Sequence, residues 1–230
     1  MQPFNLNRYF FIPLGDHCAP ALLLNELGLR KKSYPFDWIA HIDEYSGSCM
    51  PIILSLCSLV SETGNITDAL EHFLPQKNIS NPTFTCDSPL RNWIRFPHDQ
   101  FLVSDTLWQN EYHKYERRFI RFYKALISRK PIIFLCICRS YLLSPRDFSI
   151  IEKCLLAYNK LSKFIFISGQ SIPHSCLSES RILQVTVQYR NSLPSYVEYS
   201  DMLYYNHDLG YWRRNVNVEL LRILATIPDF

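Results

Sequence analysis

The chain has 230 residues, of which 47% are hydrophobic and 20% are charged, and its net charge is +3 from 24 basic and 21 acidic residues. This composition excludes an intrinsically disordered chain, and the small net charge gives no electrostatic reason to expect nucleic acid as a partner. The N-terminus lacks the basic start and apolar run of a signal peptide, and no apolar run approaches the roughly 18 residues of a membrane span. We therefore expect one cytoplasmic domain over residues 1–230, without a membrane contact.

The first thirty residues predict a strand, a sharp turn and a helix. Residues 9–14 carry the aromatic and branched side chains of a buried strand. Gly15 follows and can adopt a positive φ without steric cost. Pro20 suits the first turn of a helix, and Gly28 suits its C-terminal cap. Cys18 is therefore expected between the end of a strand and the start of a helix.

The rest of the chain alternates predicted helices and strands. Helices are predicted over residues 50–60, 110–128, 147–161 and 213–227, with a short one ending at Phe73 that Thr67 or Asp68 can cap. Strands are predicted over residues 93–96, 132–137, 164–168 and 181–188. This alternation predicts an α/β fold in a single domain: a mainly parallel open sheet with helices on both faces, a Rossmann-like or SGNH-like three-layer arrangement.

The position of Cys18 suits a nucleophile. Ligands of open parallel sheets bind beyond the carboxyl ends of the strands, which is where Cys18 is expected. A helix N-terminus favours the thiolate, and backbone N–H groups near His17 to Ala19 can receive the oxygen of a tetrahedral intermediate. The alternative is a structural cysteine that happens to follow a turn.

A cysteine nucleophile needs a base, and seven histidines compete for this role. His98 is the best candidate, because it follows a predicted strand and a proline. His207, before the last helix, is second, and His17 is a candidate for lining the cleft. The others are expected at the surface: His41, His72, His113 and His174.

The base in turn needs a group that orients it, and Asp37 and Asp99 compete. Asp99 is the sequence neighbour of His98, which is a poor position for bonding the same ring. Asp37 lies between two aromatic residues and is therefore preferred. The alternative for Asp37 is a cap of a helix or turn.

Arg117, Arg118 and Arg121 lie among the aromatic residues of the helix predicted over 110–128. Guanidinium groups suit planar anions, so Arg118 and Arg121 are candidate substrate-binding residues, together with Gly15, Asp16 and His17. One partly buried arginine is expected there, with Glu116 or Asp37 as its partner.

No cofactor or metal is expected. The chain has no phosphate-binding glycine motif, and its eight cysteines contain no Cys-x-x-Cys pair. Cys136 and Cys138 point the same way on a strand but have no nearby second pair. The seven cysteines other than Cys18 are expected to be free structural thiols.

Several blocks in fixed order resemble one known family. They are Leu14–Cys18 with Leu27–Arg30, Tyr34–Ile39 (Tyr-Pro-Phe-Asp-Trp-Ile), Phe96–Asp99 (Phe-Pro-His-Asp) and Tyr115–Phe122. Together they look like the papain-like cysteine peptidase family of otherwise unknown function, and the resemblance extends to about residue 140. It implies that Cys18 is the nucleophile and His98 its base.

The chain departs from this family at one place. Members carry small or polar residues between the glycine and the cysteine, whereas Asp16 and His17 lie there in this chain, a difference that bears on thiol acidity and substrate choice. The Gly15-Asp16-x-Cys18 spacing is also similar to the Gly-Asp-Ser block of SGNH esterases. Cysteine-dependent O-acyltransferases of polysaccharide synthesis use a comparable elbow.

Three functions therefore remain open at this point. The first is a cysteine hydrolase that acts through a thioester acyl-enzyme. The second is an acyltransferase that uses the same residues and a sugar or other hydroxyl acceptor. The third is a binding module in which Cys18 is structural. The substrate is accordingly expected to be a peptide, an acyl compound or a glycan, and the oligomeric state is not predicted.

Overall fold

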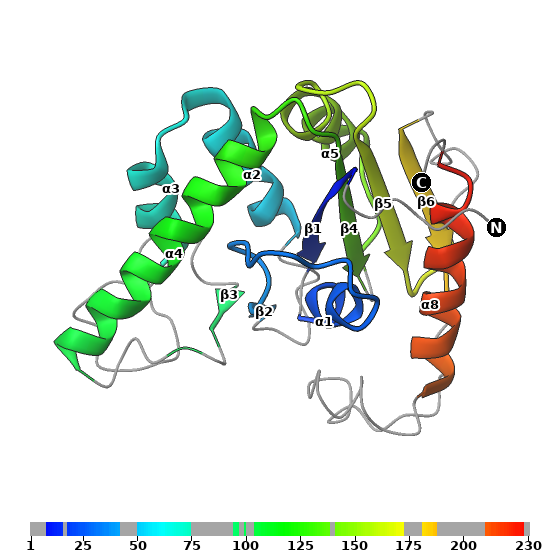
Figure 1. Cartoon of the computed structure of the whole chain (residues 1–230), viewed down its shortest axis with the longest axis horizontal. Coiled ribbons are helices and arrows are strands. Elements are labelled where there is room, and N and C mark those ends of the chain that lie inside the picture. The colour runs from blue at the N-terminus through cyan, green and yellow to red at the C-terminus, as the bar shows by residue number, and fades with distance from the viewer. Residues whose placement is uncertain are drawn as a thin grey trace.

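A computed structural model of the protein describes residues 8–15, 18–41, 50–74, 94–96, 99, 104–138, 141–172, 181–187 and 210–227. Its centre is a four-stranded sheet in the order β1 (Phe10–Gly15), β4 (Ile132–Cys138), β5 (Lys163–Ser168) and β6 (Ile182–Thr186). All three strand pairs are parallel (Figure 1). The predicted α/β fold with a parallel sheet is confirmed.

Helices cover both faces of this sheet (Figure 1). One face packs against α1 (Ala19–Glu26) and α8 (Gly210–Leu224). The opposite face packs against α2 (Met50–Thr63), α3 (Ile66–Phe73), α4 (Asp105–Leu126) and α5 (Pro145–Ile150), which continues into the π-helix η1 (Ile151–Leu155). The alternation of side chains along each strand separates the two cores: in β5, Phe164 and Phe166 enter one, and Ile165 and Ile167 enter the other.

The helix α4 contributes an aromatic core. Tyr115, Phe119 and Phe122 recur at helical spacing and are fully buried. Phe119 meets the rings of Phe36 and Phe73 edge-on, with centroids 6.0 and 5.3 Å away. Edge-to-face contacts of this kind stabilise aromatic pairs beyond their buried area. The aromatic face predicted for this helix therefore anchors the segment around Phe36 to the main body of the protein.

A two-stranded antiparallel sheet lies beside the main one. It joins β2 (Ala40–His41) to β3 (Ile94–Arg95), with Ala40 opposite Arg95 and His41 opposite Ile94. In Figure 1 the arrowheads of β1, β4 and β5 point toward the end of the molecule where β2 and β3 lie. The strand predicted over residues 93–96 is thus a two-residue strand, and it pairs outside the parallel sheet.

Several helix boundaries differ from the predicted ones because of local caps. The helix α4 begins at Asp105, not 110, since the Ser104 hydroxyl accepts a hydrogen bond from the Leu107 N–H at 3.2 Å. Ser144 and Asp147 form a capping box that starts α5 two residues before the predicted start at 147. The predicted helix over 147–161 ends early, because the π-helix closes at Leu155.

The cap of α3 was predicted wrongly. Asn65, rather than Thr67 or Asp68, is the N-cap, and its side chain accepts a hydrogen bond from the Asp68 N–H at 3.2 Å. Gly64 precedes it with a φ of 63°, which ends α2 and reverses the chain. Among the described helices, none combines the length and the apolar character that a membrane crossing requires.

Candidate active site

Cys18 is the N-cap residue of α1, three residues after the end of β1. Its carbonyl accepts the Leu22 N–H at 3.1 Å, which closes the first helical turn, and the residue is only 2% exposed. The predicted strand before Cys18 and the predicted helix after it are confirmed. Pro20 lacks an N–H group, so the helix start offers the N–H groups of Ala19 and Ala21 near this thiol.

Gly15 makes this arrangement possible. It has a φ of 149°, and a Cβ atom at this position would lie 2.8 Å from the Ile137 carbonyl oxygen on the neighbouring strand. Any other residue would combine a strained backbone with a steric clash. The glycine therefore lets the end of β1 lie close against β4, and the next two residues, Asp16 and His17, lie outside the described part of the chain.

The Tyr34–Trp38 segment is a turn held by a buried carboxylate. Asp37 is fully buried, and its Oδ2 atom accepts hydrogen bonds from the Tyr34 N–H at 3.0 Å and from Arg30 Nε at 3.0 Å. Arg30 Nη2 bonds the same oxygen and also the Ser33 hydroxyl at 2.9 Å. The Arg30 guanidinium lies 5.3 Å from the centre of the Trp38 ring. Asp37 is thus a turn cap and the partner of Arg30.

The electrostatic state of Asp37 reflects opposing effects. Burial raises the pKa of the Asp37 carboxyl above its ordinary value, because the charged form loses its hydration. The charge and hydrogen bonds of Arg30, the Tyr34 N–H and the charge of Arg118 act in the opposite direction. Asp37 Oδ1 accepts no hydrogen bond from any residue that the structure describes. One oxygen of a buried carboxylate is therefore available to a further donor.

The Phe96–Asp99 segment is anchored at both ends to α4. The Phe96 ring lies edge-on to Phe73 and Tyr115, with centroids 5.1 and 5.4 Å away. The Tyr115 hydroxyl donates to Asp99 Oδ2 at 2.5 Å, and Lys114 forms an ion pair with Asp99 Oδ1. The Asp99 N–H also donates to the Phe96 carbonyl at 3.2 Å. Both oxygens of Asp99 are therefore occupied.

Two of the sequence blocks meet in space. The pairing of β2 with β3 joins the chain just after Trp38 to the chain just before Phe96. The two candidate carboxylates, Asp37 and Asp99, therefore belong to segments that this small sheet ties together. His98 and His207 lie outside the described residues, and so does the side chain of His41. His72 and His113 are exposed on helices, as predicted.

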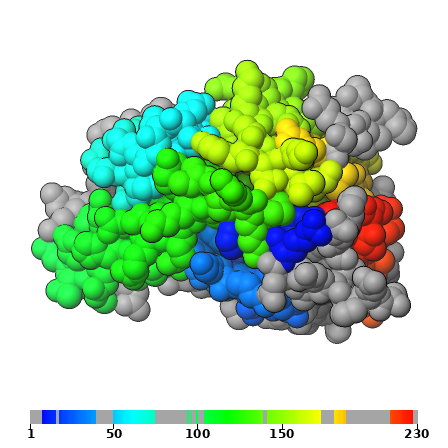
Figure 2. All heavy atoms as spheres, turned by 45° about the horizontal axis from the view of Figure 1, so that its top comes forward, coloured from blue at the N-terminus to red at the C-terminus, as the bar shows by residue number. Residues whose placement is uncertain are grey.

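The arginines of α4 approach the same turn. Arg118 is 7% exposed and its guanidinium lies 4.8 Å from the centre of the Tyr115 ring, so the predicted buried arginine is present. Arg121 Nε donates to the Ser33 carbonyl at 3.0 Å. Figure 2 shows the N-terminal segments (blue) directly against α4 (green). Glu116, one predicted partner of the buried arginine, instead contacts His113 at 3.2 Å.

Arg30, the residue that holds Asp37, is not among the site residues predicted from the sequence. Arg30 ends the Leu27–Arg30 block and stands seven residues before Asp37. A spacing of seven residues across a helix end and a turn does not reveal a contact, because it depends on how the chain reverses after Gly28. This glycine has a φ of 66°, as its predicted capping role requires.

The described cysteines besides Cys18 lie in the core. Cys57, Cys136, Cys138 and Cys154 are all buried, and the Sγ atoms of Cys136 and Cys138 lie 3.6 Å apart on one face of β4. Burial raises the pKa of the Cys57 thiol well above its ordinary value. The part of the chain that the structure describes contains no group of three or more potential metal ligands.

Comparisons with known proteins bear on the Cys18 segment. A family model described as "Putative papain-like cysteine peptidase (DUF1796)" matches residues 9–52, a segment that contains Cys18 and Asp37 but not His98. An uncharacterised protein of Acanthamoeba polyphaga mimivirus is 31% identical over 149 residues, which cover 56% of this chain and 61% of that protein. The chain therefore spans about three fifths of this relative. No solved structure matches the chain significantly.

Proposed function

We propose that this protein is a cysteine-nucleophile hydrolase of the papain-like cysteine peptidase type. The observation that carries the proposal is the position of Cys18 at the start of α1, directly after a buried parallel strand. The similarity of residues 9–52 to a family named for cysteine peptidases supports it. A thiol at a helix N-terminus is biased toward the nucleophilic thiolate.

In this proposal His98 is the base. The chain on both sides of it is anchored, at Phe96 by ring contacts and at Asp99 by Tyr115 and Lys114. The pairing of β2 with β3 adds support, because it ties the chain just after Trp38 to the chain just before Phe96.

Asp37 is the better of the two candidates for orienting the base. Asp99 uses both carboxylate oxygens on Tyr115 and Lys114. Asp37 keeps Oδ1 without a donor among the described residues, and it is fully buried. A donor such as the N–H of an imidazole would satisfy this oxygen and remove the cost of leaving it unpaired.

The reaction would proceed in two displacements. The Cys18 thiolate attacks the acyl carbon, and the oxygen of the tetrahedral intermediate is held by N–H groups at the start of α1. His98 gives its proton to the leaving group, and a thioester with Cys18 remains. Water then attacks the thioester, passing a proton to His98, and the acid product leaves with the thiolate restored. Acyl transfer would differ only in the last step, where a sugar or other hydroxyl replaces water.

The pH dependence of alkylation tests this proposal. We expect the rate at which iodoacetamide modifies Cys18, followed by mass spectrometry, to be half-maximal at a pH below about 7 rather than near the ordinary thiol pKa of about 8.5. The pH at half-maximum is the useful readout, because the low exposure of Cys18 affects the absolute rate. The fully buried Cys57 serves as an internal control and should stay unmodified.

Two histidine variants make the test specific. His98→Ala should move the half-maximal pH of Cys18 upward by at least one unit, because the thiolate loses its imidazolium partner. His72→Ala, which removes an exposed histidine on α3, should leave it unchanged. If the wild-type profile matches that of an ordinary thiol, Cys18 has no catalytic role. The function that then remains is a binding module with a structural Cys18. The acyltransferase would be favoured if the Cys18 thioester reacts with added sugars to form esters faster than it is hydrolysed.

A further inference from the structure

Three guanidinium groups gather around one carboxylate at the Tyr34–Trp38 turn. Arg30 forms an ion pair with Asp37, while Arg118 and Arg121 reach the same turn from α4. Among the described residues, no carboxylate forms an ion pair with Arg118 or Arg121. The charges of Arg30 and Asp37 cancel one another, so the positive charges of Arg118 and Arg121 have no described carboxylate to balance them at this turn.

Arg118 is the first group of the cluster. It is 7% exposed, yet its Nη1 atom has no hydrogen-bond partner among the described residues. Its guanidinium lies over the Tyr115 ring, 4.8 Å from the ring centre, a cation–π contact that does not use its N–H donors. A buried charged donor without an acceptor is unfavourable, because it has lost its hydration without gaining a hydrogen bond. An acceptor at Nη1 would remove this penalty.

Arg121 is the second group of the cluster. Its Nε atom donates to the Ser33 carbonyl, and no residue that the structure describes accepts a hydrogen bond from its two terminal nitrogens. Burial has the largest effect on the pKa of Arg121 and lowers it, and the nearby charges of Arg118 and Arg117 lower it further. Since Arg118 and Arg121 lie three residues apart on one helix, their side chains are neighbours and repel one another. An anion between them would turn this repulsion into attraction.

We infer that Arg118 and Arg121 form a binding site for an oxoanion, a carboxylate or phosphate group carried by a ligand. Guanidinium forks match the planar or tetrahedral oxygens of such groups and bind them through paired N–H donors. The turn at Ser33 fixes Arg121, and the Tyr115 ring fixes Arg118, so the donors are held before the ligand arrives. Such preorganisation reduces the entropy lost on binding.

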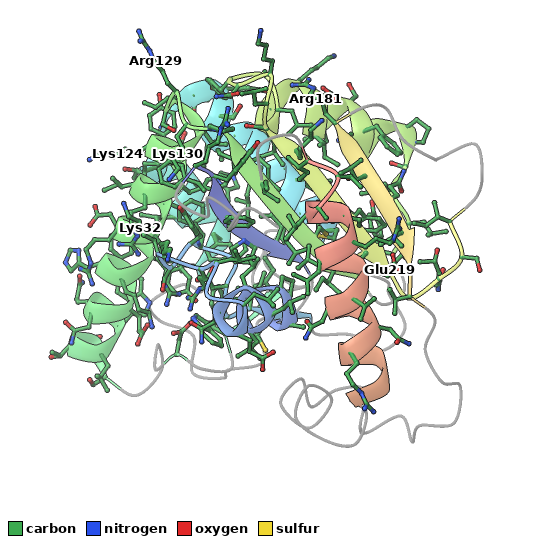
Figure 3. All side chains as sticks on the ribbon, turned by 45° about the vertical axis from the view of Figure 1, so that its right-hand side comes forward. Lys32, Lys124, Arg129, Lys130, Arg181 and Glu219 are labelled. Carbon is green, nitrogen blue, oxygen red and sulfur yellow. The ribbon has the colours of Figure 1, made fainter. Side chains whose placement is uncertain are left out.

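The surface beside this site is basic. Lys32 precedes Ser33 in the chain, and Figure 3 shows Lys32, Lys124 and Lys130 on the same side of the molecule. Lys31 and Lys32 lower the pKa of Lys130, after the larger effect of burial. Neighbouring positive charges raise the local concentration of anions and speed their association.

Direct titration with simple anions tests the site. Inorganic phosphate and acetate are added to the full chain at constant ionic strength, with chloride as the reference anion, and binding is followed by isothermal titration calorimetry and by the unfolding temperature. We expect one or both probes to bind and to raise the unfolding temperature, while chloride does not. Stronger binding of phosphate would indicate a phosphoryl-bearing ligand, and stronger binding of acetate would indicate a carboxylate-bearing one.

Three variants locate the binding. Arg121→Met, which removes a partly exposed arginine, should weaken binding by about tenfold or more, as expected for the loss of charge-assisted hydrogen bonds. Arg118→Lys keeps the charge but loses the fork, and should weaken it as well. Arg129→Met is the matched control, because Arg129 is exposed and points away from the molecule (Figure 3), and it should bind like the wild type.

The inference is overturned if neither anion binds to the wild type, or if Arg121→Met binds both as tightly as Arg129→Met does. Failure of both anions would mean that Arg118 satisfies its donor on the protein itself; Asp37 Oδ1, whose carboxyl feels the charge of Arg118 and which accepts no hydrogen bond from the described residues, is the candidate acceptor. The titration is repeated with Cys18→Ser. Because anion binding does not require the thiol, this variant should bind normally even if the proposed hydrolase activity proves wrong.

Discussion

Asp37 shows how one residue serves two requirements. Its Oδ2 atom holds the turn through the Tyr34 N–H and holds Arg30 through two N–H groups, while Oδ1 stays open among the described residues. The turn cap that the sequence offered as the alternative reading of Asp37 is therefore present. It does not compete with the proposed role beside His98, because the two roles use different oxygens.

Tyr34, in the same turn, gives a pH-dependent prediction. Burial, followed by the charge of Asp37, raises the pKa of the Tyr34 hydroxyl from 10.0 to about 12. A raised folded-state pKa means that the folded protein holds this proton more tightly, so its contribution to stability is complete below pH 10 and is lost as the pH rises through 12. We expect the free energy of unfolding of Tyr34→Phe to fall less steeply than that of the wild type between pH 10 and 12, by about 2 kcal/mol.

The measurement is urea unfolding of both proteins at matched pH values. Other groups titrate in this range, so the difference between the two proteins is the informative quantity. Parallel curves above pH 10 would mean that Tyr34 ionises in the folded protein as easily as in the unfolded chain.

At the scale of the elements, the caps decide where helices begin. Side chains of Asn65, Ser104 and Ser144 accept backbone N–H groups at the starts of α3, α4 and α5. Each start precedes the predicted one: the cap of α3 lies two or three positions before the predicted caps, α4 begins five residues early and α5 begins two residues early. The choice among neighbouring polar residues depends on the backbone conformation before the helix, such as the positive φ of Gly64.

This difference can be measured on α3. Asn65→Ala removes the observed cap and should lower the free energy of unfolding by about 1 kcal/mol, which for a chain of this size is a decrease of about 2–4 °C in the unfolding temperature. Thr67→Ala, at the exposed position that the sequence favoured, should change stability by less than about 0.5 kcal/mol. Equal losses in the two variants would contradict the cap assignment.

At the scale of the whole molecule, the parallel sheet connects two hydrophobic cores. Adjacent residues of β4 enter different cores: Ile132 packs with α4 and its neighbours, and Ile133 packs with α1 and α8. Both side chains are almost completely buried, at 2% and 0% exposure. Because both cores share the same strands, neither can lose its packing without disturbing the other.

This sharing predicts cooperative unfolding. Ile132→Ala and Ile133→Ala should each lower the free energy of unfolding by about 2–5 kcal/mol, and each should shift one common transition. Leu221→Ala, at a 44% exposed position of α8, should change it by less than about 0.5 kcal/mol. Calorimetry that resolves two transitions, each shifted by only one of the substitutions, would contradict a single domain over residues 1–230.

The four strands of the parallel sheet and the position of Cys18 at a helix start could be predicted from the sequence alone. These features depend on local properties: apolar runs of strand length, the conformational freedom of Gly15 and the fixed φ of Pro20. The single buried arginine of α4 was also predictable, because aromatic residues surround it at helical spacing.

The partners of these residues, in contrast, depend on how distant segments pack together. The ion pair of Asp37 with Arg30, the commitment of Asp99 to Lys114 and Tyr115, and the pairing of β2 with β3 all join segments whose approach depends on packing. The sequence also does not show that Asp37 Oδ1 and Arg118 Nη1 have no hydrogen-bond partner among the described residues. A hydrogen bond requires two atoms within about 3 Å, and sequence patterns specify faces and periods but not distances of that kind.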